Sequence, residues 1–192
     1  MAGSVAWGAE VRRRQWLLSL TLTPLAAHAQ PAAAGPPPEL TGELPGARLQ
    51  GSARMRSLGL HIYDARLWVG AQPIAGEWAS LPFALELQYA RSLKGEQIAE
   101  RSLKEMQRQG ELAALTAERW LGNMKQLFPD VDAGDRITGL NVPGTGARFF
   151  VNGSFRGEPR ETDFARVFFG IWLSPRTSEP ALRQALLGRK RP

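Results

Sequence analysis

Few side chains in this sequence are suited to covalent catalysis or metal binding. The chain contains no Cys, and His61 is the one His that follows residue 29. Thiolate nucleophiles and Cys/His zinc sites are therefore excluded. A Ser-His-Asp triad would have to use His61, which falls inside a predicted strand, and no GxSxG turn is present to expose a serine. Because P-loop and GxGxxG motifs are also missing, we expect no cofactor and no metal.

Three acidic residues in the segment PDVDAGD look at first like a calcium-binding loop. An EF-hand loop needs oxygen ligands at positions 1, 3 and 5, and a Glu at position 12. Counted from Asp130, position 5 is Gly134 and position 12 is Asn141. We therefore interpret residues 130–135 as the turn between a helix and a strand.

Arginine and tyrosine side chains offer the remaining chemistry, which is binding. Arg54 precedes a segment rich in aromatic and β-branched residues, and Tyr63 and Tyr89 lie on predicted strands. An arginine at the mouth of an apolar cavity can bind both oxygens of a carboxylate. The sequence thus predicts a carboxylate clamp at Arg54 with two phenols beside it. The alternative is a surface arginine and two half-buried tyrosines.

The most apolar segment is FARVFFGIWL, residues 164–173. It is too short to span a bilayer, which needs about 20 residues. Its apolar residues recur at helical spacing, so it predicts an amphipathic helix packed on a sheet, with Thr162 or Asp163 as N-cap. Its aromatic side chains either fill the core or line an apolar pocket, and Phe168 and Trp172 are the candidates for such a lining.

The order of predicted elements indicates an α+β domain. Three strands are expected first, at 48–56, 58–69 and 81–91, and the alternating pattern of the third indicates that it is half-buried. Three more are expected at 136–142, 148–151 and 155–157, with Asn152-Gly153 as the hairpin turn between the last two. Helices are expected at 96–109, from a cap at Thr116 to Phe128, and at 163–173 and 178–187. Because strands and helices are segregated, we expect a large antiparallel sheet with helices on one face.

The two ends of the chain have the composition of targeting and linker sequence. Arg12 to Arg14, an apolar run over 16–25 and Ala27-His28-Ala29 predict a signal peptide over residues 1–29. Export to a bacterial periplasm follows, by the Sec or the twin-arginine route. The Pro- and Ala-rich residues 30–46 predict a disordered linker, and 189–192 a solvated basic tail, leaving 47–188 as the domain.

Charge and hydropathy limit the partners. The formal net charge of +6 is modest, and no basic stripe is interleaved with aromatic residues, so nucleic acid is not an expected partner. No apolar segment after the signal peptide is long enough for a transmembrane span. The expected partner is an apolar or amphiphilic small molecule.

Several segments in this order resemble the chalcone isomerase-like family of bacterial exported proteins. They are GLHIYDARLW (59–68), FALELQYARSLKGEQIA (83–99), FPDVDAGDRITG (128–139) and DFARVFFGIWLSPRTSEPALRQALLG (163–188). The resemblance implies an open-faced sandwich in which a large antiparallel sheet carries a layer of helices, with a cleft between them. In plant enzymes of this fold the cleft closes a flavanone ring, whereas non-catalytic relatives hold fatty acids there.

Carrying the family's residues over leaves the enzymatic activity uncertain and favours a protein that is not an enzyme. The catalytic tyrosine falls on Ile98, an asparagine on Glu105, and a threonine near Tyr63, while Arg54 is the counterpart of the ligand-binding arginine. Without a phenol or hydroxyl to stabilise the developing enolate, cyclisation would lose its electrostatic stabilisation.

Three functional hypotheses follow. The first is an exported, non-catalytic domain that binds an apolar, carboxylated, fatty-acid-like ligand between sheet and helices, using Arg54, Tyr63, Tyr89, Phe168 and Trp172. The second is an intramolecular lyase or isomerase that uses a rearranged set of Tyr63, Tyr89 and Arg54. The third is a structural or interaction protein with a filled core and no ligand.

Overall fold

The computed structural model describes residues 35–189, which contain six strands and five helices. The strands are β1 (Arg48–Ser57), β2 (Leu60–Val69), β3 (Phe83–Tyr89), β4 (Arg136–Val142), β5 (Gly146–Val151) and β6 (Ser154–Gly157). The helices are α1 (Leu40–Glu43), α2 (Gly95–Gln107), α3 (Ala114–Leu127), α4 (Thr162–Leu173) and α5 (Pro180–Leu186). Except for α1, each lies where the sequence predicts it.

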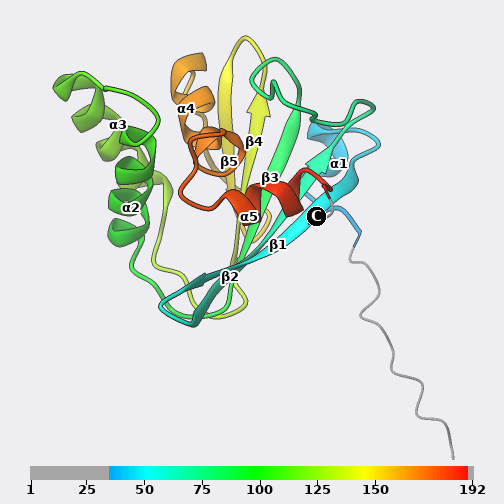
Figure 1. The fold of residues 1–192 in the computed structure, drawn as a ribbon, viewed down its shortest axis with the longest axis horizontal. Helices are drawn as coiled ribbons and strands as arrows, with labels where there is room; N and C mark the ends of the chain where they lie inside the picture. The colour runs from blue at the N-terminus through cyan, green and yellow to red at the C-terminus, as the bar shows by residue number, and fades with distance from the viewer. Residues whose placement is uncertain (1–34, 190–192) are drawn as a thin grey trace, which may run out of the picture. The chain divides into compact units, whose positions relative to one another are not determined.

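The strands form one antiparallel sheet in the order β1-β2-β3-β4-β5-β6, so each strand pairs with its neighbours in the sequence (Figure 1). Helices α2 and α3 are inserted between β3 and β4, and α4 and α5 follow β6. This segregation confirms the predicted α+β class with an antiparallel sheet.

The main core lies between the helices and one face of the sheet, which we call the inner face. Helix α4 packs over β5, and its Phe164 and Phe168 rings stack 5.6 Å apart. Phe149 of β5 meets Phe168 edge-on at 5.1 Å, an arrangement that aromatic rings favour. Helix α2 adjoins α4, and α5 lies along β1. The predicted amphipathic helix over 163–173 is therefore confirmed, with eight of its residues buried.

Helix α1 covers the opposite face of the sheet, which we call the outer face. The prediction of a disordered linker over 30–46 is therefore wrong for the residues that form α1, Leu40–Glu43. Leu40 and Leu44 are 0% and 4% exposed. They form a second apolar cluster with outward-facing sheet residues, namely Trp68, Ala84, Leu140 and Phe150. The Pro- and Ala-rich composition obscured this pair, whose spacing of four residues places both side chains on one side of a single helical turn.

Polar contacts attach the same segment to the sheet. The Glu39 carboxylate accepts hydrogen bonds from Arg136 at 3.0 Å and from the Thr138 hydroxyl at 2.7 Å. Its side chain is 1% exposed, so this pairing is shielded from water.

Strand β3, predicted to be half-buried, is buried on both faces, because Ala84 and Glu86 lie on the face toward α1.

Two hairpins have two-residue turns with the same backbone conformation. Asn152-Gly153 joins β5 to β6 with φ values of 50° and 85°, as predicted. Leu58-Gly59 joins β1 to β2 with φ values of 50° and 79°. The predicted strand over 58–69 therefore begins two residues later, at Leu60. Positive φ at both central positions suits Asn and Gly but is unusual for Leu.

The structure also corrects smaller details at the ends of elements. Thr116 does not cap α3, which begins at Ala114, and neither Thr162 nor Asp163 caps α4, whose N-cap position is Glu161. Arg189, expected in the solvated tail, donates a hydrogen bond to the carbonyl of Ala75. The predicted signal peptide and residues 190–192 lie outside the described residues. Within residues 35–189, no helix is long and apolar enough to cross a membrane.

Candidate functional site

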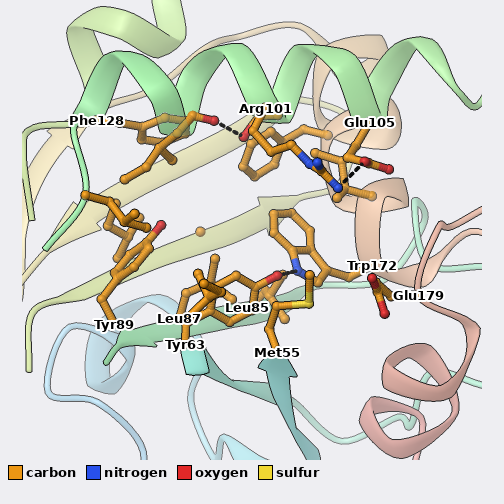
Figure 2. A pocket seen from close by; sticks show the side chains of 18 of the residues that line it. Met55, Tyr63, Leu85, Leu87, Tyr89, Arg101, Glu105, Phe128, Trp172 and Glu179 are labelled. Carbon is orange, nitrogen blue, oxygen red and sulfur yellow. Dashed lines mark hydrogen bonds and ion pairs between the residues drawn. The ribbon is translucent and has the colours of Figure 1, made fainter. Parts of the chain in front are cut away.

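A cavity of about 310 Å³ lies between the inner face of the sheet and helices α2 and α4. Its size is at the lower end of the range for small-molecule sites, roughly 300 to 1,000 Å³. Its walls are mostly apolar and include Ile98 and Phe168. Figure 2 labels four more apolar lining residues, Met55, Leu85, Leu87 and Phe128. The filled-core hypothesis predicted solid packing between the 163–173 helix and the sheet, and the cavity contradicts that expectation.

The structure brings together four of the five predicted ligand-binding residues. Phe168 of α4 lines the cavity. So do Tyr63 of β2, Tyr89 of β3 and Trp172 of α4, which Figure 2 labels. Their convergence follows from the fold, because β2 and β3 pair Tyr63 with Tyr89, and Trp172 of α4 hydrogen-bonds to Tyr63. Whether these side chains contact a ligand stays a prediction.

Arg54, the fifth predicted residue, does not line the cavity. It points to the outer face, where its Nε lies 2.8 Å from Asp64 Oδ1, and its side chain is 53% exposed. His61 Nε2 lies 3.2 Å from the same oxygen. The prediction of Arg54 as a clamp is therefore wrong, because alternate residues of a strand face opposite sides and the neighbouring Met55 takes the inner side. The rearranged isomerase set of Tyr63, Tyr89 and Arg54 is not assembled around one site.

Tyr63 and Trp172 form a polar contact inside the apolar wall. The indole N–H of Trp172 donates to the Tyr63 hydroxyl oxygen over 3.0 Å. Burial raises the pKa of Tyr63 to about 12, so the phenol is protonated at neutral pH. Because its oxygen accepts the indole N–H, the Tyr63 hydroxyl keeps its own proton to donate toward a molecule in the cavity.

Tyr89 provides a second phenol next to the first. The two rings meet edge-on with their centroids 6.0 Å apart. Burial also raises the pKa of Tyr89, and the neighbouring Tyr63 raises it further. Both hydroxyls are therefore neutral hydrogen-bonding groups in an apolar wall, and neither can serve as a phenolate base near neutral pH.

Helix α2 places Glu105 and Arg101 at the edge of the cavity, and Arg101 was not among the predicted site residues. Arg101 Nη2 lies 2.8 Å from Glu105 Oε1, and Arg108 Nε lies 3.5 Å from the other oxygen of Glu105. The Arg101 side chain is 60% exposed, whereas that of Glu105 is 9% exposed. Glu179, in the loop before α5, also lines the cavity. The site thus has one arginine and two carboxylates in its lining.

The spacing of α2 explains why these residues reach the cavity. Ile98, Arg101, Ser102 and Glu105 occupy positions i, i+3, i+4 and i+7 of the helix, so all four lie on the side that lines the cavity. A ligand-facing arginine could have been found from this pattern, because Arg101 falls between Ile98 and Glu105 on the helix surface. Nothing in the sequence around Glu179 distinguishes it.

The mouth of the cavity lies between α2 and the β1–β2 hairpin, since the lining residues Ser57, Gln97 and Arg101 are exposed. Ile98, the residue that the resemblance aligned with a catalytic tyrosine, contributes an apolar side chain to the lining. Within residues 35–189, no group of three or more His, Cys, Asp or Glu residues is arranged to hold a metal ion. The arrangement can enclose an apolar molecule and hydrogen-bond its polar end.

Comparisons with known proteins agree with this geometry. A solved structure with the same fold is a fatty-acid binding protein of Arabidopsis thaliana, with a TM-score of 0.59 and 14% sequence identity over 75% of this chain and 88% of that one. An uncharacterized protein of Haemophilus influenzae is 28% identical over 108 residues, which are 56% of this chain and 52% of the relative. The chain therefore spans about half the length of that relative. The model of the chalcone isomerase-like family matches residues 48–188, and the chain belongs to this family.

Proposed function

We propose that this domain is a non-catalytic carrier that binds an amphiphilic, fatty-acid-like molecule in the cavity. The observation that carries the proposal is a mostly apolar cavity whose mouth bears an exposed arginine, Arg101. A fatty acid needs these two features, an apolar enclosure for the chain and a cation for the carboxylate. The solved neighbour from Arabidopsis thaliana is described as a fatty-acid binding protein, which adds support from the fold.

Arg101 is suited to this role because its partner, Glu105, has a second arginine close enough to neutralise its charge. Arg108 also approaches Glu105, at 3.5 Å. When Arg101 turns toward a ligand carboxylate, Arg108 continues to neutralise the nearly buried Glu105. This second cation matters, because a nearly buried carboxylate left without any partner would be strongly destabilising. Arg101 thereby replaces Arg54 as the proposed clamp.

The lining favours binding over turnover. Ile98 occupies the position that the family resemblance assigns to a catalytic tyrosine, and its side chain cannot position water or stabilise an oxyanion. The Tyr63 and Tyr89 phenols are held in their neutral forms by burial, which raises both pKa values. These groups can donate hydrogen bonds to a carboxylate, so their proposed role is to hold the head group beside Arg101.

We also propose that the protein works in a bacterial periplasm. The support comes from the sequence of residues 1–29, with its three consecutive arginines, apolar run and Ala-His-Ala segment. Fractionation of cells that express the full chain, followed by N-terminal sequencing, tests this part. Processed protein in the periplasmic fraction is expected, and unprocessed protein confined to the cytoplasm would contradict it.

Extraction of the purified protein tests the binding function. The protein is washed, extracted with chloroform and methanol, and the extract analysed by mass spectrometry beside an extract of an Arg101→Ala variant. We expect amphiphiles in amounts comparable with the protein, and less in the variant. Lys104→Ala is the matched control, because Lys104 lies on α2 but not in the cavity lining. Protein that releases nothing and binds no added fatty acid would contradict the proposal.

A further inference from the structure

The β1–β2 hairpin carries apolar side chains that nothing covers in the described part of the chain. Leu58 is 99% exposed and Leu60 is 53% exposed. Most exposed leucines need no explanation, because much of any protein surface is apolar. Leu58 differs because it occupies a turn position whose backbone conformation is unfavourable for it.

The other hairpin shows which residue this backbone position favours. Asn152 and Leu58 have the same φ of 50°, and each precedes a Gly with positive φ. Asn is a preferred residue in such turns, whereas a branched side chain is strained there. Leu58 gains no packing that would offset the strain, since its side chain is almost fully exposed. Strain that is retained without structural benefit indicates a role in binding.

The hairpin also forms one side of the cavity mouth. Met55, Ser57 and Ile62, which flank the turn on both strands, line the cavity. The exposed Ser57 is adjacent to Leu58 in the sequence, and Arg101 of α2 lies across the mouth from the hairpin. A surface that contacts Leu58 would therefore also face the opening through which a ligand enters.

Positive charges without acidic partners flank the exposed leucines. Arg56 is exposed and donates one long hydrogen bond, of 3.4 Å, to the Gly59 carbonyl. Arg91 is exposed and follows Ala90, whose N–H bonds to the Ile62 carbonyl. Within residues 35–189, neither arginine has a carboxylate within 4.0 Å. Asp64 of β2 is already paired with Arg54.

We propose that the β1–β2 hairpin docks on an anionic lipid bilayer. Leu58 and Leu60 enter the boundary between head groups and acyl chains, Arg56 and Arg91 contact lipid phosphates, and the adjacent cavity exchanges its ligand with the bilayer. The exchange step rests on the proposed carrier function. An apolar tip flanked by cations suits a bilayer surface. The tip is too small for a stable protein interface, which buries about 800 Å² on each partner.

Co-sedimentation with vesicles tests the docking. The full chain is mixed with vesicles of phosphatidylcholine, with or without phosphatidylglycerol. Leu58→Asn, which reproduces the Asn-Gly turn of the other hairpin, should weaken binding to anionic vesicles about tenfold. Arg56→Gln should weaken it about fivefold. Leu115→Asn is the matched control, because Leu115 is 79% exposed but lies on α3, and it should bind as wild type does.

Two further measurements separate docking from the carrier function. Leu58→Asn should melt at the same temperature as the wild type or higher, because it relieves turn strain, and should bind cis-parinaric acid normally without vesicles. Equal sedimentation of Leu58→Asn and wild type would overturn the inference, and so would a lower melting temperature, which would give Leu58 a structural role. Vesicle binding that depends on Leu58 in a protein that ignores cis-parinaric acid would support docking while contradicting the carrier function.

Discussion

Trp172 of α4 donates its indole N–H to the phenol oxygen of Tyr63 on β2, over 3.0 Å, and so joins the helical layer to the sheet at the cavity wall. The contact places a polar pair in a mostly apolar lining. The indole N–H occupies one acceptor position of the phenol oxygen. The Tyr63 proton is thereby left for a partner in the cavity.

Tyr63→Phe should destabilise the fold by about 1 to 3 kcal/mol, because the Trp172 N–H loses its partner in a buried setting. Urea unfolding of the variant measures this loss. Tyr89→Phe is the matched control, since no hydrogen bond contributes to the pKa shift of Tyr89, and its loss should be smaller. A larger loss for Tyr89→Phe than for Tyr63→Phe would show that the indole bond does not support the wall.

Stability should fall with rising pH between about 10 and 12. Burial raises the pKa of Tyr63 from 10.0 to about 12 in the folded protein. Below pH 10 the phenol is protonated in both states, whereas above it the unfolded chain ionises first, which favours unfolding. Two pKa units correspond to roughly 2 to 3 kcal/mol. Urea titrations across this range should show a shallower decline for Tyr63→Phe, and the same decline in both proteins would contradict the assignment.

Helix α1 should contribute to stability although it lies in a segment with the composition of a linker. Leu40→Ala should cost about 2 to 5 kcal/mol, because Leu40 is 0% exposed against Trp68 and Leu140. Denaturant unfolding measures the loss, and Leu49→Ala, at a site that is 39% exposed, should cost less. If Leu40→Ala unfolded at the same denaturant concentration as the wild type, the outer face would not need α1.

Glu179→Gln should strengthen the binding of a carboxylated probe. Glu179 lines the cavity, and its negative charge adds to the raised pKa of Tyr63, for which burial is the main cause. Removing the charge of Glu179 removes its repulsion of the probe's carboxylate. The affinity for the probe should rise between about twofold and tenfold, depending on how well water screens the two carboxylates from each other. Fluorescence titration with cis-parinaric acid measures it, and Glu111→Gln, at an exposed position outside the lining, should change nothing. Weaker binding by Glu179→Gln would mean that the ligand's head group donates hydrogen bonds to Glu179.

Strong periodic patterns made most of the fold predictable. The alternation in β3 and the helical spacing in α4 predicted both elements, and Asn152-Gly153 predicted its turn. The Leu58-Gly59 turn was missed because Leu does not favour positive φ, so the residue carries no turn signal. Helix α1 was missed because one helical turn has no period, and its stability comes from contacts with distant strands.

The walls of the candidate site could be predicted better than its charges. Tyr63, Tyr89, Phe168 and Trp172 were found because large apolar and aromatic residues on predicted elements must face the core. Arg54 was misplaced although the alternation of Ala53 and Met55 with the arginines already indicated that it faces outward. Glu179 depends on how a loop packs across the cavity, which no local pattern specifies.

Titration of cis-parinaric acid into the wild type, Arg101→Ala and Arg54→Ala tests the carrier function most directly. Both arginines are more than half exposed and each pairs with one nearby carboxylate, but only Arg101 lines the cavity. The account predicts saturable binding by the wild type, binding about fivefold to tenfold weaker for Arg101→Ala, and unchanged binding for Arg54→Ala. No binding by the wild type, or weaker binding for Arg54→Ala alone, would contradict it.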